Sequence, residues 1–286
     1  MATNSGNQIG NQDGDAVAVY PAPETAQIEE IGPPRKQDHT WLLRLASILI
    51  ILSAWELLGR RIAPLFMSYP TAISIAALRM IRNGELIEAL LQSLATLLLG
   101  FAVAAVLGMA LGLLLGRYRA LDAATDWLVS ALYSTPLVAV VPLVILWFGL
   151  GFQAKFFIVV ILAIFPILIN TASGVRNVSG TLIDVGTAFA ATERQVFLKI
   201  ILPAALPYMV TGLRLGIGRA IIGVVVAEFF TAITGLGALI VKYGNQYDTA
   251  SMFVPILMLM LLGIGLTDAL RRVEEWIAPW RRADEE

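Results

Sequence analysis

Residues 89–116 read ALLQSLATLLLGFAVAAVLGMALGLLLG, a run of 28 residues without a charged side chain. Three more such runs follow, at 127–154, 156–175 and 249–267. A helix needs about 20 apolar residues to cross the hydrocarbon core of a bilayer. The whole chain is 58% hydrophobic and only 14% charged, whereas soluble domains carry about 25% charged residues. The sequence therefore predicts an all-α integral membrane protein.

Six transmembrane helices account for the apolar stretches. We expect them near residues 41–58, 91–116, 127–150, 156–174, 208–230 and 252–270. The third contains Pro136 and Pro142, each of which removes a backbone hydrogen bond and disfavours a straight helix. An amphipathic connector is expected at 60–86. Residues 39–286 then form one six-span transmembrane domain.

Residues 1–38 are rich in Asn, Gly, Asp, Gln and Pro and show no periodic apolar pattern, which predicts a disordered tail. Six spans place both ends of the chain on one side of the membrane. If that side is the cytoplasm, the cytoplasmic segments hold 12 basic residues and the external ones 6, with Arg214 and Arg219 of the fifth span set aside. The positive-inside rule therefore predicts cytoplasmic N- and C-termini.

Composition excludes several classes of activity. The chain has no cysteine, which rules out disulfides, thiol catalysis and cysteine metal sites. Its one histidine is His39, in the polar tail. The net charge of −1 gives no electrostatic signature for nucleic acid. An intramembrane enzyme would lack the usual catalytic groups, so we expect no catalytic residues, no metal and no nucleic-acid partner.

Two places in the spans are candidates for a translocation path. Tyr133, Ser134 and Thr135 come directly before Pro136, and carbonyls freed by a proline are tolerated where they face protein or water. The alternative is a kinked packing helix with capping hydroxyls. Glu228 lies in the fifth span, where ionisable residues usually face a bundle interior or an aqueous cavity. Its alternative role is a structural hydrogen bond to a neighbouring helix.

Small residues recur every four positions along the second span. Small side chains let helix backbones approach closely in lipid. This stripe predicts tight packing, either at a subunit or pore-lining interface or inside the bundle. Its members are Thr96, Gly100, Ala104, Gly108, Gly112 and Gly116.

A polar segment separates the fourth and fifth spans, and residues 181–207 of it read TLIDVGTAFAATERQVFLKIILPAALP. Leu182, Val185 and Phe189 recur at a spacing of three to four residues, which predicts an apolar face on a short helix. Such a face needs a groove to fill. Asp184 is a candidate for capping or charge-stabilising a helix N-terminus. A generic amphipathic loop is the alternative.

The spacing in this segment resembles the cytoplasmic coupling loop of ABC importer permeases, which reads E-A-A, three residues, G, nine residues, I-x-L-P. The matching positions here are Asp184, Val185, Gly186, Ala190, Ile200, Ile201, Leu202 and Pro203. Ala190 stands where these permeases usually have glycine. Glycine allows a turn with positive φ, a conformation that is unfavourable for alanine. Phrases such as TPLVAVVPLVILWFGLG and FPILINTASGVRNV extend the resemblance over residues 69–282, toward permeases for nitrate, sulfonate, taurine and bicarbonate.

The resemblance implies a six-span subunit with the type I ABC importer permease fold, in a bacterial inner membrane, that pairs as a homodimer. Two ATP-binding subunits would hold the ATP and Mg²⁺ and grip the coupling loop, residues 175–205. An extracytoplasmic solute-binding protein would deliver a small anion such as a sulfonate, nitrate, bicarbonate or an organic carboxylate. The alternative is an autonomous ion-coupled transporter, but such proteins often show internal repeats, and none is visible here.

Overall fold

The computed structural model of the chain describes residues 40–62, 66–231 and 233–277. The tail predicted at 1–38 lies outside these residues. The chain divides into two units at Ser47. Of the first unit the structure describes only the start of α1, whose side chains are exposed from Trp41 onward. The packing below is that of the second unit, residues 48–286.

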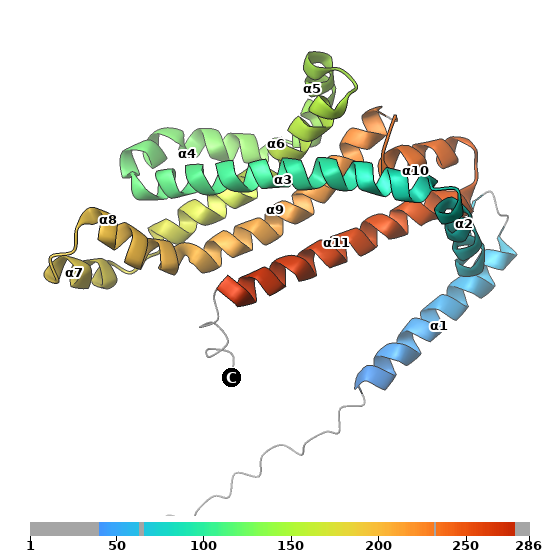
Figure 1. The fold of residues 1–286 in the computed structure, drawn as a ribbon, viewed down its shortest axis with the longest axis horizontal. Coiled ribbons are helices and arrows are strands. Elements are labelled where there is room, and N and C mark those ends of the chain that lie inside the picture. The colour runs from blue at the N-terminus through green and yellow to red at the C-terminus, as the bar shows by residue number, and fades with distance from the viewer. Residues whose placement is uncertain (1–39, 63–65, 232, 278–286) are drawn as a thin grey trace, which may run out of the picture. The chain divides into compact units, whose positions relative to one another are not determined.

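The described residues form helices joined by short connections (Figure 1). The elements are α1 (Thr40–Arg61), α2 (Pro70–Arg82), α3 (Glu85–Arg117), α4 (Arg119–Ser134), η1 (Leu137–Val140), α5 (Val141–Phe148), α6 (Phe152–Arg176), α7 (Gly180–Ala188), α8 (Glu193–Val196), η2 (Phe197–Ile201), α9 (Leu202–Thr231), α10 (Leu236–Asn245) and α11 (Thr249–Ile277).

Within the described residues, five helical segments are long and apolar enough to cross a membrane, and they contain α1, α3, α6, α9 and α11. The pair formed by α4 and the segment 137–148 passes the same test as one broken span, bent by 84°. The prediction of six spans in an all-α protein is therefore confirmed.

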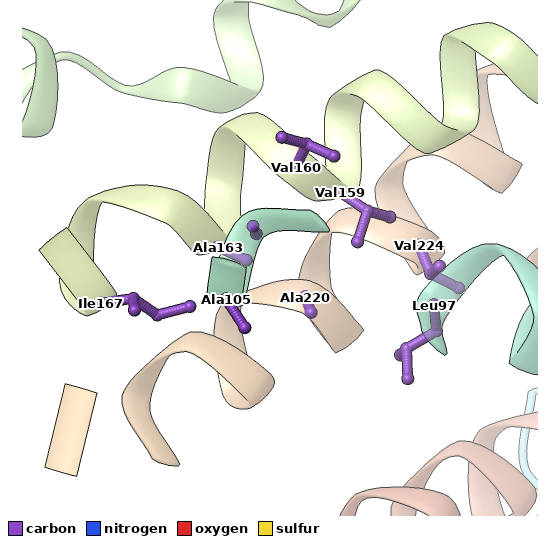
Figure 2. Close-up of a cluster of buried hydrophobic side chains, with 9 residues drawn as sticks. Leu97, Ala105, Val159, Val160, Ala163, Ile167, Ala220 and Val224 are labelled. Atoms are coloured by element: carbon purple, nitrogen blue, oxygen red, sulfur yellow. The ribbon is translucent and has the colours of Figure 1, made fainter. Parts of the chain in front are cut away.

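The centre of the second unit is built from α3, α6 and α9. α6 packs along both of the others (Figure 1), and it is the most buried of the five spans. Figure 2 shows the side chains that fill this centre, most of which are alanine or β-branched. They are Leu97, Ala104, Ala105, Val159, Val160, Ala163, Ile167, Ala220 and Val224. Because these side chains are short, the three helices lie close together.

The stripe of small residues on α3 faces α6. A Cβ atom added at Gly100 would lie 2.7 Å from Val159, and one at Gly112 would lie 2.6 Å from Thr171. Added Cβ atoms at Gly108 and Gly116 would meet Ile167 and Val175 of α6 at 3.0 and 2.6 Å. The stripe therefore packs inside the chain, which was one of its two interpretations.

The two prolines of the third span have different roles. Pro136 lies at the break between α4 and η1, where the chain turns. Pro142 stands in the first turn of α5, where a proline removes no helical hydrogen bond. The prediction that Pro142 also breaks a helix is wrong, because the helix begins there.

Helix α10 was not predicted from the sequence, since a segment of 10 residues is too short to read as a span. Its Leu236 and Leu239 are buried in a cluster with α2 and α11. α2 itself confirms the amphipathic connector, because Ile73, Ala76 and Met80 form its buried face.

Candidate functional site

The predicted coupling loop is helical for most of its length. α7 follows the end of α6. α8 then begins one long helical segment that runs from Glu193 through η2 and α9 to Thr231. η2 is a π-helical turn that ends at Ile201, two residues before Pro203. The missing N–H of Pro203 cannot bond to the carbonyl four residues earlier. Such turns are frequent at functional sites.

The turn between α7 and α8 is a Schellman motif. The Ala191 N–H donates to the Gly186 carbonyl at 3.0 Å, and the Ala190 N–H donates to the Thr187 carbonyl at 2.9 Å. Ala190 has φ = +55°, the left-handed conformation that this motif requires and that glycine usually supplies. Because alanine is disfavoured there by roughly 1–2 kcal/mol, the turn is strained at this residue.

A capping box starts α8. The Thr192 N–H donates to Gln195 Oε1 at 2.8 Å, and the Gln195 N–H donates to Thr192 Oγ1 at 3.3 Å. The two residues satisfy each other's backbone donors, so the sequence places the start of the helix there.

α7 presents an apolar face to the surroundings. The side chains of Leu182 and Val185 are each 50% exposed, and that of Phe189 is 84% exposed. The opposite face is seated on η2, because a Cβ at Gly186 would lie 2.7 Å from Ile200 Cδ1. The predicted apolar face therefore exists, and no part of the described chain covers it.

The other coupling-loop candidates lie near this face. Asp184 is exposed in the middle of α7, and Ser179 occupies the N-cap position. The expectation that Asp184 caps a helix is therefore wrong. Leu202 begins α9 half-buried, and Pro203 follows it exposed to the surroundings.

At the other end of α9, Glu228 is fully buried. Its carboxylate accepts a hydrogen bond from Ser93 Oγ at 2.7 Å and another from the Gly237 N–H at 2.8 Å. Ser93 Oγ also accepts the Leu236 N–H at 2.8 Å. A Cβ at Gly235 would overlap the Glu228 carboxylate, and Gly235 has φ = +99°. Glu228 thus joins α9, α3 and the start of α10.

A buried lysine lies beside this network. The side chain of Lys155, in the first turn of α6, is 4% exposed. Its ammonium donates to Thr234 Oγ1 at 2.5 Å and to the Thr234 carbonyl at 3.3 Å. The sequence offered no signal for Ser93 or Thr234, but the glycines at 235 and 237, placed soon after an intramembrane acid, were a usable sign of this turn.

A second polar contact joins α10 to α3. Lys242 Nζ and Tyr243 Oη each donate to the Glu85 carboxylate at 2.6 Å. Burial, together with the adjacent Glu85 carboxylate, raises the pKa of Tyr243 to about 12. The phenol therefore keeps its proton and remains a donor at neutral pH.

The residues around the break in the third span bond locally. Tyr133, Ser134, Thr135 and Pro136 are all exposed. Ser134 Oγ donates to the Ser130 carbonyl at 2.8 Å, and Thr135 Oγ1 donates to a carbonyl of its own helix at 2.9 Å. A role in the translocation path stays a prediction for these residues and for Glu228.

The comparisons with known proteins agree with one another. A family model, binding-protein-dependent transport system inner membrane component, matches residues 104–279. The formylaminopyrimidine transport permease protein ThiX of Halalkalibacterium halodurans is 32% identical over 239 residues, which is 82% of this chain and 94% of that protein. The putative aliphatic sulfonates transport permease protein SsuC of Bacillus subtilis is 32% identical over 255 residues, 88% of this chain and 92% of that protein.

The taurine transport system permease protein TauC of Escherichia coli is 26% identical over 245 residues, 83% of this chain and 89% of that protein. Among solved structures, a chain of the MetNI methionine ABC transporter in an inward-facing conformation aligns with a TM-score of 0.55 at 23% identity. The alignment covers 65% of this chain and 93% of that one, and it supports the fold alone.

Proposed function

The chain belongs to the family of binding-protein-dependent transport system inner membrane components, and from this premise we propose that two copies of it form the translocation path of an ABC importer for a small anion. The names of its sulfonate and taurine relatives support an anionic solute. No observation favours the autonomous ion-coupled transporter.

The apolar face of α7 is the observation that carries this proposal. Leu182, Val185 and Phe189 are exposed on a short helix outside the packed centre. An apolar helix face of this kind fits a hydrophobic groove on a partner. The partner is an ATP-binding subunit, one for each copy of the chain. That subunit holds the ATP and Mg²⁺, whereas this chain binds no cofactor and catalyses no reaction.

Packing contacts couple α7 mechanically to the membrane-spanning helices. α7 rests on η2 through Gly186 and Ile200, and η2 continues without interruption into α9. α9 packs along α6, and α6 packs along α3. Because close-packed helices move as units, a displacement of α7 by its partner passes along α9 to the far end of the bundle.

The orientation follows from the same assignment. α7 faces the cytoplasm of a bacterial cell with both termini on that side, and the end with Glu228 and α10 faces outward. There the solute-binding protein delivers the solute. The solute then passes the break at Tyr133, Ser134, Thr135 and Pro136, which remain the candidates for the lining of the path.

The test is co-purification of the tagged chain with its ATP-binding subunit from bacterial membranes. Phe189→Ser should lower the amount of bound ATPase about tenfold or more, because buried aromatic anchors dominate helix-in-groove contacts. Phe66→Ser is the matched control. Its side chain is 79% exposed, but it lies between α1 and α2, far from α7 in the chain.

Two outcomes contradict the proposal. A wild-type chain that purifies alone, under conditions that preserve other importers, would point to the autonomous transporter. Equal ATPase recovery with Phe189→Ser and Phe66→Ser would move the docking site away from α7. Asp184→Lys gives a second check, because reversing an exposed charge on the docking helix should weaken the same complex.

A further inference from the structure

A cavity lies at the end of α3 and α6 that is remote from α7. Its volume is about 600 Å³, within the range of about 300–1,000 Å³ typical of small-molecule sites. α6 has 25 residues, so its two ends are roughly 37 Å apart. The polar side chains of the lining are Gln92, Thr96, Lys155 and Thr234, and Gly151 and Phe152 at the start of α6 also line it.

The wall of this cavity carries one ionised group. Lys155 lines it, and no acidic side chain does. Burying an ammonium requires compensating contacts, and two come from Thr234. An ammonium has three N–H donors, so these two contacts do not use its full capacity. The cavity therefore presents a buried positive charge.

The first turn of α6 adds to this positive character. Gly151 is its N-cap residue, and no side chain caps the helix there. The first N–H groups of a helix lack intrahelical acceptors and carry a partial positive charge. Gly151, Phe152 and Lys155 all line the cavity, so the N-terminal end of α6 forms part of its wall.

The nearby carboxylate does not occupy the cavity. Glu228 interacts electrostatically with Lys155, but its two oxygens accept hydrogen bonds from Ser93 and Gly237. Glu228 is absent from the lining. It thus compensates part of the charge of Lys155 without lining the cavity, whereas Lys155 does line it.

We propose that this cavity binds a small oxyanion, the charged end of the transported solute, on its way from the outer face into the translocation path. Lys155 and the α6 N-terminus hold the charge. The Gln92 amide donates one N–H to Glu88 Oε1 at 3.2 Å, and its second N–H contributes a neutral donor. The identity of the occupant as solute rests on the proposed function, whereas the anion site itself rests on the cavity.

The test uses the purified complex of the chain with its ATP-binding subunit, in nanodiscs of phosphatidylcholine, with ethanesulfonate as the probe. Lys155→Met should lower the affinity about tenfold or more, because charge-assisted hydrogen bonds are the stronger class. Lys155→Arg should stay within about threefold of wild type. Lys242→Met is the matched control, since that lysine is half exposed, pairs with Glu85 and does not line this cavity.

Equal affinity of Lys155→Met and wild type would overturn the proposal, as would a wild-type complex that binds none of ethanesulfonate, sulfate, nitrate and bicarbonate. Should Lys155→Met fail to assemble, Gln92→Leu replaces it, with an expected loss of about threefold or more. Competition by added phosphatidylglycerol would assign the site to a lipid headgroup and overturn its role for solute.

The same preparations separate this inference from the proposed function. Retained ATPase with no anion binding defeats the oxyanion site alone. A wild-type chain without ATPase defeats the proposed function, and anion binding that still depends on Lys155 in that chain would leave the site standing.

Discussion

The two ends of the central helices are built on opposite principles. At the end with Glu228, polar groups are buried and paired within the chain, as Ser93 and the Gly237 N–H show. At the end with α7, apolar groups are exposed and uncovered by the described chain, above all Phe189. Burying a polar group is unfavourable unless it is hydrogen-bonded, and exposing a large apolar group forgoes the stabilisation of burial.

The two ends therefore differ in what stabilises them. Hydrogen bonds within the chain stabilise the Glu228 end, whereas the α7 end presents an apolar face suited to a partner. The Glu228 carboxylate, Ser93 and the Gly237 N–H satisfy one another within the chain. At the α7 end the described chain leaves Leu182, Val185 and Phe189 exposed, and under the proposed function the groove of an ATP-binding subunit buries them. Four substitutions test whether the contrast holds.

The largest effect is expected at Glu228. Glu228→Leu removes the acceptor of Ser93 and Gly237 and the nearby compensation of Lys155. It should lower the free energy of unfolding by about 3 kcal/mol or more, measured on the purified chain in detergent. Glu228→Gln keeps an acceptor oxygen and should cost less. If Glu228→Leu unfolds like wild type, this end does not depend on its buried network.

The next effect concerns the link between the two ends. Gly112→Ala places a Cβ 2.6 Å from Thr171 and 2.7 Å from the Leu168 carbonyl, and overpacking of this kind costs about 1–3 kcal/mol. Gly265→Ala is the control, because nothing lies within 4 Å of its added Cβ. The comparison is of unfolding free energies and of transport by the assembled complex. Equal unfolding free energies and equal transport for the two variants would show that α3 and α6 do not need their close approach. Gly112→Leu should lower the free energy of unfolding more than Gly112→Ala does.

A stabilising change is expected at the α7 end. Ala190→Gly relieves a left-handed alanine and should raise the stability of the turn by about 1 kcal/mol. Ala188→Gly, two residues earlier at the last position of α7, should lower it by about 0.5–1 kcal/mol. Hydrogen exchange of the α7 amides measures both. If both substitutions change the stability of the turn in the same direction, the result contradicts the left-handed conformation of Ala190.

The smallest effect is expected for an ion pair at the α7 end. Arg176 Nη1 donates to both oxygens of Asp122 at 2.7 Å, and both side chains are partly exposed. Asp122→Asn should cost about 0.2–1 kcal/mol, and less at high salt. A loss as large as that for Glu228→Leu would break the contrast, because it would mean that polar contacts at this end are also shielded from water.

The spans and the coupling segment were predictable because their signals are local. Six apolar stretches, the spacing of Leu182, Val185 and Phe189, and the need for a positive φ at Ala190 all depend on nearby residues. The start of α7 was not predictable in this way. We expected Asp184 to cap a helix, but α7 begins four residues earlier, at Gly180, because a helix starts where the preceding chain turns.

The partners of Glu228 were beyond the reach of sequence. Ser93 lies 135 residues away in the chain, and no local pattern marks which hydroxyl will meet a buried carboxylate. Helix α10 was missed because its ten residues are too few to read as a span, and the sequence does not mark the residues of α2 and α11 that cover Leu236 and Leu239.

The sequence by itself determined which stretches are long and apolar enough to cross a membrane and which short polar segment separates two of them, because hydrophobicity and spacing act on residues that are close in the chain. The tertiary structure alone decided that the glycine stripe faces α6, that Glu228 joins three helices, and that Lys155 lines a cavity. Those outcomes depend on the approach of helices separated by up to 143 residues, as in the contact of Leu236 with Ser93, and only packing brings such groups together.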